Sequence, residues 1–222
     1  MNKQLITALE PQKKHPDRRS VYADGTFLFG LNEEVCIKMG LRQGMEYTPE
    51  ELEQIRREGE LFDAKSYSFR LLARRGYSVA GIVKKLEDRD YLPETVEQTV
   101  ALLCRLGYLN DAEYARAYAH DAVVLRKKGK RLVIHELLTR GIDRETAEQA
   151  WEAVCEQNDQ GDVLAQIIAK RLKDPSDKKA VRRVFDYCIR RGYDYAAVSD
   201  ALRQYIEEEM NEESGTDFFG LS

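Results

Sequence analysis

KLEDRDYLPETVEQT at residues 85–99 returns in altered form as ELLTRGIDRETAEQA at 136–150 and as YCIRRGYDYAAVSDA at 187–201. The three stretches are evenly spaced (136 − 85 = 51 and 187 − 136 = 51) and align without a gap. A fixed period of this size is the signature of stacked supersecondary units. The sequence therefore predicts a repeat protein, a class that usually holds partners along an extended surface rather than processing small molecules in a pocket.

Apolar residues within each repeat recur at the spacing of an amphipathic helix. In the first repeat, the apolar positions from Val79 to Leu86 fall at i, i+3, i+4 and i+7, on one helix face. A helix before this one and a helix after it complete the unit, so we predict three short helices per repeat. The first helices of the three repeats are expected to begin near Asp63, Asp111 and Asp162.

Several predicted helices end at a glycine that is followed by an apolar residue. If Gly141 is the left-handed residue that ends its helix, Ile142 lies against Leu137 as in a Schellman motif. Asp90 occupies this position in the first repeat, where a left-handed non-glycine residue costs on the order of 1 kcal/mol. A different turn is the alternative there. The other glycines expected to end helices in this way are Gly76, Gly107 and Gly192.

The first sixty residues show strand patterns instead. Asp24-Gly25 separates two alternating stretches, which is a strong signal for a two-residue hairpin turn. We interpret residues 15–17 as a loop and residues 33–39 as a short helix ended by Gly40. Residues 48–51, Thr-Pro-Glu-Glu, predict a helix start with a capping box.

These patterns predict a mainly α protein. Three tandem three-helix repeats are expected to form an elongated array, preceded by a small N-terminal module that contains a β-hairpin. One unit alone has too little apolar surface to fold independently, which favours stacking. The expected divisions are 1–60 for the β-rich module with a linker helix, 61–110, 111–158 and 159–210 for the repeats, and 211–222 for an acidic flexible tail.

Composition sets further bounds. The net charge is −4, but residues 160–204 hold ten lysines and arginines against six acids. Such a chain is not built for indiscriminate DNA coating, although it can bind one anionic site. Without a membrane-length apolar stretch or a signal-peptide core, we expect a cytoplasmic protein. The cysteines have no framework spacing and are expected to be buried in a reducing compartment; they are Cys36, Cys104, Cys155 and Cys188.

Motifs that carry chemistry are missing from the sequence. It has no phosphate-binding glycine loop, no HExxH and no GxSxG. His120 and His135 lack metal-ligand neighbours at suitable spacing and are interpreted as surface or packing residues, and Trp151 as a core residue. We therefore expect no catalytic residue, no metal and no cofactor.

Basic residues form the clearest candidate site. Residues 126–131, RKKGKR, contain five cations between the first two helices of the second repeat. They either form a solvated helix end and loop, or contact nucleic-acid phosphate or an acidic partner. Basic pairs occur at related places in the other repeats. The candidate contacts are Arg74, Arg75, Lys84, Lys85, Arg126, Lys127, Lys128, Lys130, Arg131, Lys178, Lys179, Arg182 and Arg183.

Three strings carry a family resemblance. GYLNDAEYARAY at 107–118 resembles the most distinctive segment of the RecX family, regulators of the RecA recombinase. LLARRGYSVAGIVKKL at 71–86 and GKRLVIHELLTRGI at 129–142 are similar to the segments on either side of it. The match covers most of residues 64–155 and the third repeat more loosely. The N-terminal module is similar to that of family members from Gram-positive bacteria.

The resemblance implies a non-enzymatic protein that docks into the groove of the RecA–single-stranded DNA filament. Family members restrain recombinase, ATPase and co-protease activities, which places this protein in homologous recombination, DNA repair and the SOS response. It implies a monomer, with RecA as partner, possible weak direct DNA contact, no membrane and no cofactor. The basic contacts named above rest on charge and repeat register, not on the family.

Two other hypotheses stay open. Three-helix units with basic edges also resemble helix-turn-helix modules, so the protein can be a nucleic-acid-binding helical repeat that acts without a recombinase. A general helical-repeat scaffold would instead bind unrelated proteins. Binding to naked single-stranded DNA with a steep salt dependence separates the first of these from a protein-directed regulator.

Overall fold

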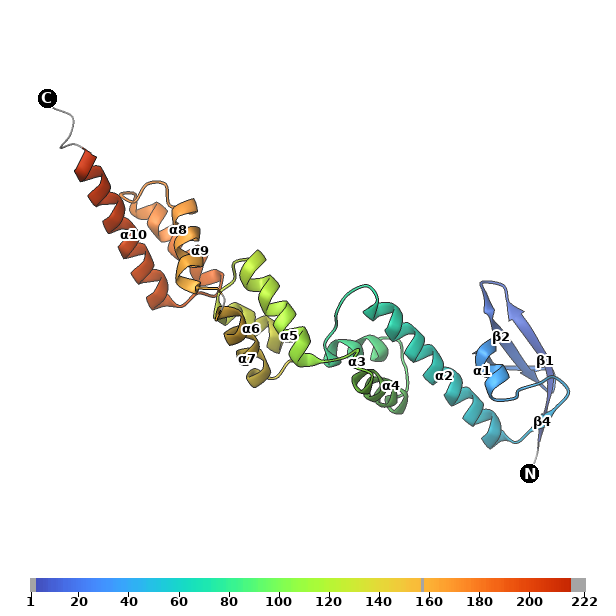
Figure 1. Ribbon diagram of the computed structural model, residues 1–222. Coiled ribbons are helices and arrows are strands. Elements are labelled where there is room, and N and C mark those ends of the chain that lie inside the picture. Colours follow the sequence, from blue (N-terminus) through green and yellow to red (C-terminus); the bar gives the residue numbers. More distant parts are fainter. Residues whose placement is uncertain (1–2, 157, 217–222) are drawn as a thin grey trace. The chain divides into compact units, whose positions relative to one another are not determined.

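Two compact units make up the chain, Met1–Leu109 and Asn110–Ser222. The structure is a computed structural model that describes residues 3–156 and 158–216, and side chains through residue 211. Helices dominate both units, and the one β-sheet described lies at the start of the first (Figure 1). The predicted fold class, helical repeats behind a small β-module, is therefore confirmed.

The N-terminal module is a four-stranded antiparallel sheet of order β3-β2-β1-β4. Asp24 and Gly25 both have positive φ, as the predicted two-residue hairpin turn requires. The prediction of a loop at residues 15–17 is wrong, because strand β2 already begins at His15. Proline cannot donate to a strand ladder, and Pro16 falls at an irregularity in the pairing of β1 and β2. The strands are β1 Gln4–Gln12, β2 His15–Ala23, β3 Thr26–Asn32 and β4 Glu46–Tyr47.

A single long helix, α2 (Pro49–Leu72), follows the short helix α1 (Glu33–Lys38). Its predicted capping box is present, with Thr48 and Glu51 bonded reciprocally. No helix begins near Asp63, contrary to our expectation, because the predicted linker helix and the first helix of the first repeat are continuous. A glycine inside a helix normally costs about 1 kcal/mol. Here Gly59 admits Leu31, whose Cδ1 would lie 2.0 Å from an added Cβ.

Helix α2 therefore serves two cores. Its first half packs on the sheet through Leu52 and Ile55. Its second half contributes Ala64 to the core of the first repeat, beside α3 (Val79–Glu87) and α4 (Pro93–Arg105).

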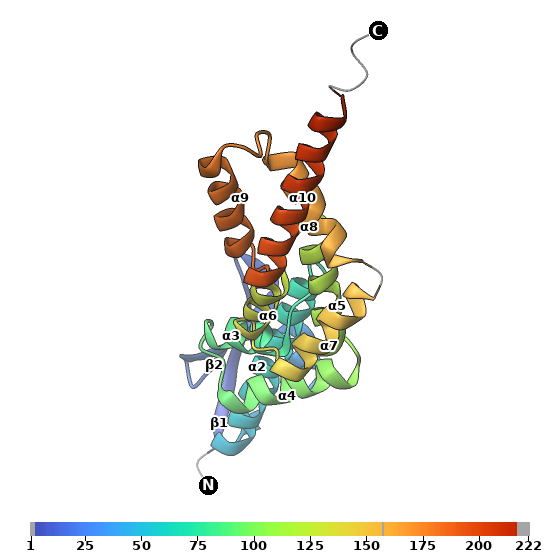
Figure 2. The same cartoon turned by 90° about the vertical axis from the view of Figure 1, so that its left-hand side faces the viewer.

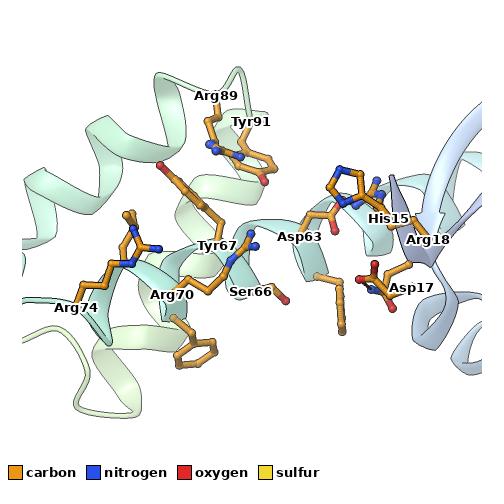
Figure 3. Close-up of a pocket in the computed structure, with 14 residues that line it drawn as sticks. His15, Asp17, Arg18, Asp63, Ser66, Tyr67, Arg70, Arg74, Arg89 and Tyr91 are labelled. Atoms are coloured by element: carbon orange, nitrogen blue, oxygen red, sulfur yellow. Dashed lines mark hydrogen bonds and ion pairs between the residues drawn. The ribbon is translucent and has the colours of Figure 1, made fainter. Parts of the chain in front are cut away.

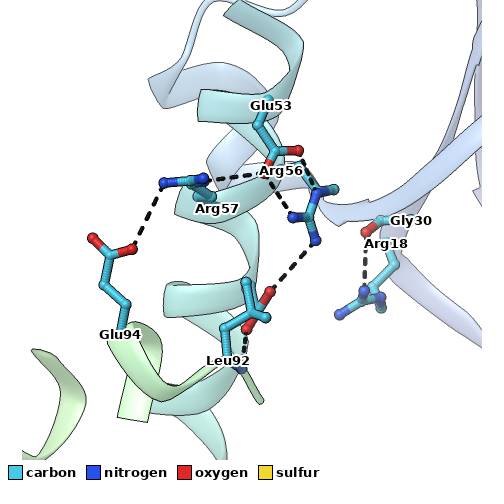
Figure 4. A network of polar contacts seen from close by, with 8 residues as sticks. Arg18, Gly30, Glu53, Arg56, Arg57, Leu92 and Glu94 are labelled. Carbon is cyan, nitrogen blue, oxygen red and sulfur yellow. Dashed lines mark hydrogen bonds and ion pairs between the residues drawn. The ribbon is translucent and has the colours of Figure 1, made fainter. Parts of the chain in front are cut away.

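Ion pairs on the solvent side tie α2 to the start of α4 (Figure 4). Glu53 accepts hydrogen bonds from both Arg56 and Arg57, and these bonds lower its pKa to about 2. Arg57 also reaches Glu94 at 3.6 Å. The backbone N–H of Leu92 donates to the carboxylate of Glu60 at 2.8 Å. Because helix α4 has no side-chain cap of its own, this bond satisfies a donor at its N-cap residue.

The second unit contains two more helical trios. They are α5 Asp111–His120, α6 Lys130–Leu138 and α7 Arg144–Cys155, followed by α8 Gln160–Arg171, α9 Lys178–Arg190 and α10 Tyr195–Thr216. Each trio encloses its own apolar core, and Figure 2 shows α8, α9 and α10 gathered together. The expectation of a flexible tail from residue 211 is wrong for residues 211–216, which continue α10 as helix. The remainder of that predicted tail, 217–222, lies outside the described residues.

The repeat register predicted from the sequence is visible in the turns that follow α3, α6 and α9. Leu86, Leu137 and Cys188 are completely buried, and each accepts the Schellman hydrogen bond from five residues ahead. The left-handed position is Gly141 or Gly192 in the later repeats. In the first repeat Asp90 takes the same conformation at φ 59°, so the turn is kept rather than replaced. The expected turn at Gly107 is also present.

Two smaller predictions are wrong. Gly76 does not end a helix, because α2 ends at Leu72 and is capped by Ala73. Of the four cysteines expected to be buried, Cys104 is exposed and Cys155 is only partly buried, whereas Cys36 and Cys188 are buried. Cys104 directly follows the buried Leu103, but successive residues of a helix point in different directions, so the Cys104 side chain points out of the core. Trp151 is a core residue, as predicted.

Candidate anion-binding grooves

A partly buried polar network fixes the basic segment of the second repeat. The Lys128 Nζ atom lies 2.6 Å from Glu136 Oε1 and 2.7 Å from its Oε2. The Tyr118 hydroxyl donates to the same carboxylate at 2.5 Å. Only 13% of the Lys128 side chain is exposed. The interpretation of residues 126–131 as a wholly solvated loop is therefore wrong at Lys128, whose charge already has an internal partner.

The network shifts the ionisation of both of its acidic members. Burial alone would raise the pKa of Glu136, but hydrogen bonds from Lys128 and Tyr118 outweigh it and leave that pKa lowered. Burial, followed by the hydrogen bond to Glu136, raises the pKa of Tyr118 to about 12. The guanidinium of Arg140 lies 4.4 Å from the centre of the Tyr118 ring. The carboxylate thus stays ionised and the phenol stays protonated at neutral pH.

Two glycines hold the second and third repeats together behind this network. The Gly129 N–H donates to the Arg191 carbonyl at 2.8 Å, and the Arg131 N–H donates to the Gly192 carbonyl at 3.1 Å. A Cβ at Gly129 would lie 2.5 Å from the Gly192 carbonyl carbon. A Cβ at Gly192 would lie 2.4 Å from the backbone nitrogen of Leu132. Only glycine allows the two backbones to approach this closely.

The chain before Gly129 is also specially shaped. A five-residue π-helical turn, η1 Asp121–Leu125, ends α5, and Lys127 follows with φ 51°. The Tyr193 hydroxyl from the third repeat donates to the Lys127 carbonyl at 3.3 Å. The basic segment therefore packs against the third repeat, and Arg126, Lys127 and Lys128 line a groove together with residues of that repeat.

A groove of about 890 Å³ lies where the basic segment meets α8 and α9. We call it the unit 2 groove. No aspartate or glutamate is among the described residues that line it. Arg171 lies 3.7 Å from the ring centre of Tyr187, and the Nε atom of Arg191 is buried without a hydrogen-bond partner. The cations that line the groove are Arg126, Lys127, Lys128, Lys170, Arg171, Arg183 and Arg191.

The unit 2 groove brings together four of the predicted contacts and leaves others outside it. Arg126, Lys127, Lys128 and Arg183 line it. Lys170, Arg171 and Arg191 also line it but were not among the predicted contacts, although Lys170 and Arg171 form another basic pair in the last turn of α8. The remaining candidates of this unit do not line the groove: Lys130, Arg131 and Lys179 are exposed elsewhere, and Lys178 and Arg182 line a smaller hollow beside Phe185.

A second groove, of about 1050 Å³, lies in the first unit between strand β2, helix α2 and the turn after α3 (Figure 3). We call it the unit 1 groove. Of the predicted contacts in this unit, only Arg74 lines it. Arg75 instead lies over the Tyr77 ring at 4.5 Å, and Lys85 pairs with Asp88 at 3.5 Å. Lys84 is exposed on α3 outside the groove. The cations missed by sequence reasoning are Arg18, Arg70 and Arg89.

The described residues contain no cluster of three or more side chains suited to a metal ion. Over the same part of the chain, no helix has the combined length and apolar character needed to cross a bilayer. What the structure offers is three-helix repeats that carry concave surfaces rich in arginine and lysine. These features define a helical-repeat protein whose grooves are lined by basic side chains.

Comparison with known proteins identifies the family. The model of the RecX N-terminal domain matches residues 4–48, and those of the first and second three-helix domains of RecX match 64–103 and 110–150. The chain belongs to the RecX family of regulatory proteins.

Curated relatives and solved structures agree with this assignment. The regulatory protein RecX of Clostridium perfringens strain 13 is 24% identical over 93% of this chain and 99% of its own length. That of Bacillus subtilis strain 168 is 25% identical over 95% of this chain and 80% of its own. A crystal structure of a regulatory protein RecX covers 89% of this chain and 99% of its own, at a TM-score of 0.63 and 22% identity. RecX from Lactobacillus salivarius covers 67% and 97%, with a TM-score of 0.60 at 18% identity.

Proposed function

We propose that this protein binds the RecA filament on single-stranded DNA and mainly inhibits its recombinase, ATPase and co-protease activities, without catalysis of its own. Membership of a family of regulatory proteins supports a regulatory role. In this proposal the protein acts as a cytoplasmic monomer in recombination, DNA repair and the SOS response.

The unit 2 groove is the observation that carries the proposal. A nucleoprotein filament presents phosphates and acidic side chains, and arginine binds both with paired N–H donors. The guanidinium groups of Arg171 and Arg191 lie over the Tyr187 ring and are oriented before a partner arrives. Preorganised side chains lose less conformational entropy on binding than free ones.

RecA's DNA-dependent ATP hydrolysis tests this proposal. The full chain, added at substoichiometric amounts, should slow hydrolysis. The double variant Lys170→Glu and Arg183→Glu should need about tenfold more protein for the same effect, because it places two negative charges in the groove. Both side chains are exposed, so the fold should survive.

A charge-matched control separates the groove from net charge. The variant Arg105→Glu and Arg116→Glu changes two exposed arginines that line neither groove, and it should inhibit like the parent chain. An unchanged hydrolysis rate with the parent chain would contradict the function itself. Equal potency of the groove variant and the parent would instead contradict the role of the unit 2 groove.

The same acid-free lining favours a second candidate function, nucleic-acid binding without a recombinase. In that case the chain binds naked single-stranded DNA with a steep salt dependence and leaves RecA hydrolysis unchanged. Weak binding to naked DNA together with strong inhibition of RecA favours the first proposal.

A further inference from the structure

Three arginines in the unit 1 groove have no carboxylate partner. Arg70 lies in the last turn of α2, Arg74 lies in the turn that follows this helix, and Arg89 approaches from the turn after α3. All three are exposed, and none has an acidic group within ion-pair distance among the described residues. Arg18 differs, because it pairs with Asp63 at 2.5 Å and donates to the Gly30 carbonyl.

Aromatic side chains share this wall. The guanidinium of Arg89 lies 3.9 Å from the ring centre of Tyr67, and Tyr91 follows two residues later in the same turn. Both tyrosines are only partly buried and both line the groove. A tyrosine hydroxyl is protonated at neutral pH, and burial raises the pKa of Tyr91 further, so this group is a hydrogen-bond donor there. Figure 3 shows both rings on the same side as Arg70 and Arg74, away from the residues of strand β2.

Charge is graded along the groove. Arg70 and Arg74 are at one end, whereas Asp17, His15 and the paired Arg18 come from β2 at the other. An anionic ligand is therefore drawn toward the α2 end. The volume of about 1050 Å³ is at the upper limit for small-molecule sites. A chain segment fits it better than a single small anion does.

We propose that the unit 1 groove binds a short segment of single-stranded nucleic acid, with phosphates on Arg70 and Arg74 and a base against the Tyr67–Tyr91 wall. Arg70 and Arg74 line the same end of the groove, so one extended strand can place a phosphate on each. Cations that follow a backbone, combined with aromatic faces for bases, are the recurring design of single-strand binding surfaces. An acidic protein segment would use the arginines but would leave the aromatic wall without a role.

This site is distinct from the unit 2 groove and does not depend on the proposed action on RecA. Its test therefore uses naked DNA. Fluorescence anisotropy of labelled oligothymidylate is measured with the full chain over a range of salt concentrations. The variant Arg70→Glu and Arg74→Glu is compared with the control Arg105→Glu and Arg116→Glu.

The groove variant should bind at least about tenfold more weakly than the control, with a salt slope reduced by about 1.4, because each lost phosphate contact removes about 0.7 on single strands. A milder variant, Arg70→Gln and Arg74→Gln, should show the same reduction in slope. Equal affinity and equal slope in the groove and control variants would overturn the proposal.

Photo-cross-linking shows independently where on the protein the oligonucleotide binds. An oligonucleotide that carries 5-bromouracil should cross-link to the peptides that contain Tyr67 or Tyr91. Cross-links confined to the unit 2 groove would contradict the assignment. The same would follow if the groove variant lost affinity for a polyglutamate peptide but kept its affinity for oligothymidylate, since the site would then serve an acidic protein segment.

Discussion

The first and second repeats place an arginine over a tyrosine at matching positions but use the pair differently. Arg89 lies over Tyr67 in the first repeat, and Arg140 lies over Tyr118 in the second, each 51 residues further on. In the second repeat Glu136 accepts a hydrogen bond from the tyrosine and an ion pair from Lys128. In the first repeat, Lys85 stands at the position of Glu136, so no such network forms.

The comparison shows how one scaffold yields two outcomes. A single acid, Glu136, binds both the tyrosine hydroxyl and Lys128, so the tyrosine becomes part of the network that fixes the basic segment. A lysine at the equivalent position leaves the tyrosine and its arginine facing an open groove.

Gly192→Ala should have the largest effect. The residue has φ 90°, and the new Cβ would collide with the backbone of Leu132. Left-handed strain and overpacking together should lower the free energy of unfolding by about 2–4 kcal/mol. Chemical denaturation of the full chain measures this loss. Gly107→Ala is the control, since its Cβ meets nothing within 4 Å and only the strain remains. Equal losses in the two variants would contradict close backbone packing between the second and third repeats.

Lys128→Ala should follow in size. It removes the main partner of a carboxylate that is only 23% exposed, and leaving such a group poorly satisfied costs about 1–3 kcal/mol of unfolding free energy. The matching test in the first repeat is Lys85→Ala, which loses only a surface pair with Asp88 and should change stability by less than about 0.5 kcal/mol. Similar losses in both variants would show that the two repeats do not differ as described.

Alkaline pH should weaken the second repeat through Tyr118. Its folded-state pKa of about 12 exceeds the ordinary value of about 10. A raised pKa means that the stabilisation is complete below pH 10 and is lost as the pH rises through 12. Tyr193 and Cys188 have raised pKa values in the same unit, so the informative quantity is the difference between the parent chain and Tyr118→Phe. Unfolding free energy measured between pH 9 and 12 should fall more steeply in the parent chain. Parallel curves would contradict the assigned role of the Tyr118 hydroxyl.

Asp90→Gly should have the smallest effect and the opposite sign. Asp90 holds a left-handed conformation that glycine adopts without strain, as Gly141 and Gly192 do at matching positions. Because glycine also gains entropy in the unfolded chain, we expect a net stabilisation of only about 0.5 kcal/mol. Thermal unfolding measures it, with Asp88→Gly as a control that should destabilise. A loss of stability in Asp90→Gly would show that the aspartate side chain stabilises the turn.

Local signals in the sequence predicted much of the fold. The 51-residue period predicted the buried positions at Leu86, Leu137 and Cys188 and the turns that follow them. The capping box at Thr48 and the Asp24-Gly25 hairpin depend on neighbouring residues alone, and both were predicted correctly.

Features that depend on distant partners were not predicted. Repeat register suggested a helix start at Asp63, but this side chain pairs with Arg18 of strand β2 instead of capping a helix. Nothing near Lys128 shows that Tyr118 and Glu136 bury its charge. Likewise, Lys170 joins the unit 2 groove only because the third repeat folds against the basic segment. The sequence therefore predicted part of the basic residues of the candidate site, whereas the groove that they line depends on tertiary contacts.

Because helix α2 is continuous, it fixes the rotation of the N-terminal module relative to the first repeat about the helix axis. The sheet of the module packs against the first half of α2, and helices α3 and α4 pack against its second half. Adding one residue between Gly59 and Asp63 would turn the two ends by about 100° and separate them by about 1.5 Å. Arg18 and Asp63 would then point apart, and the two walls of the unit 1 groove would no longer face each other. Only insertions of whole helical turns would lengthen α2 and still keep the two walls of the unit 1 groove on the same side of the helix.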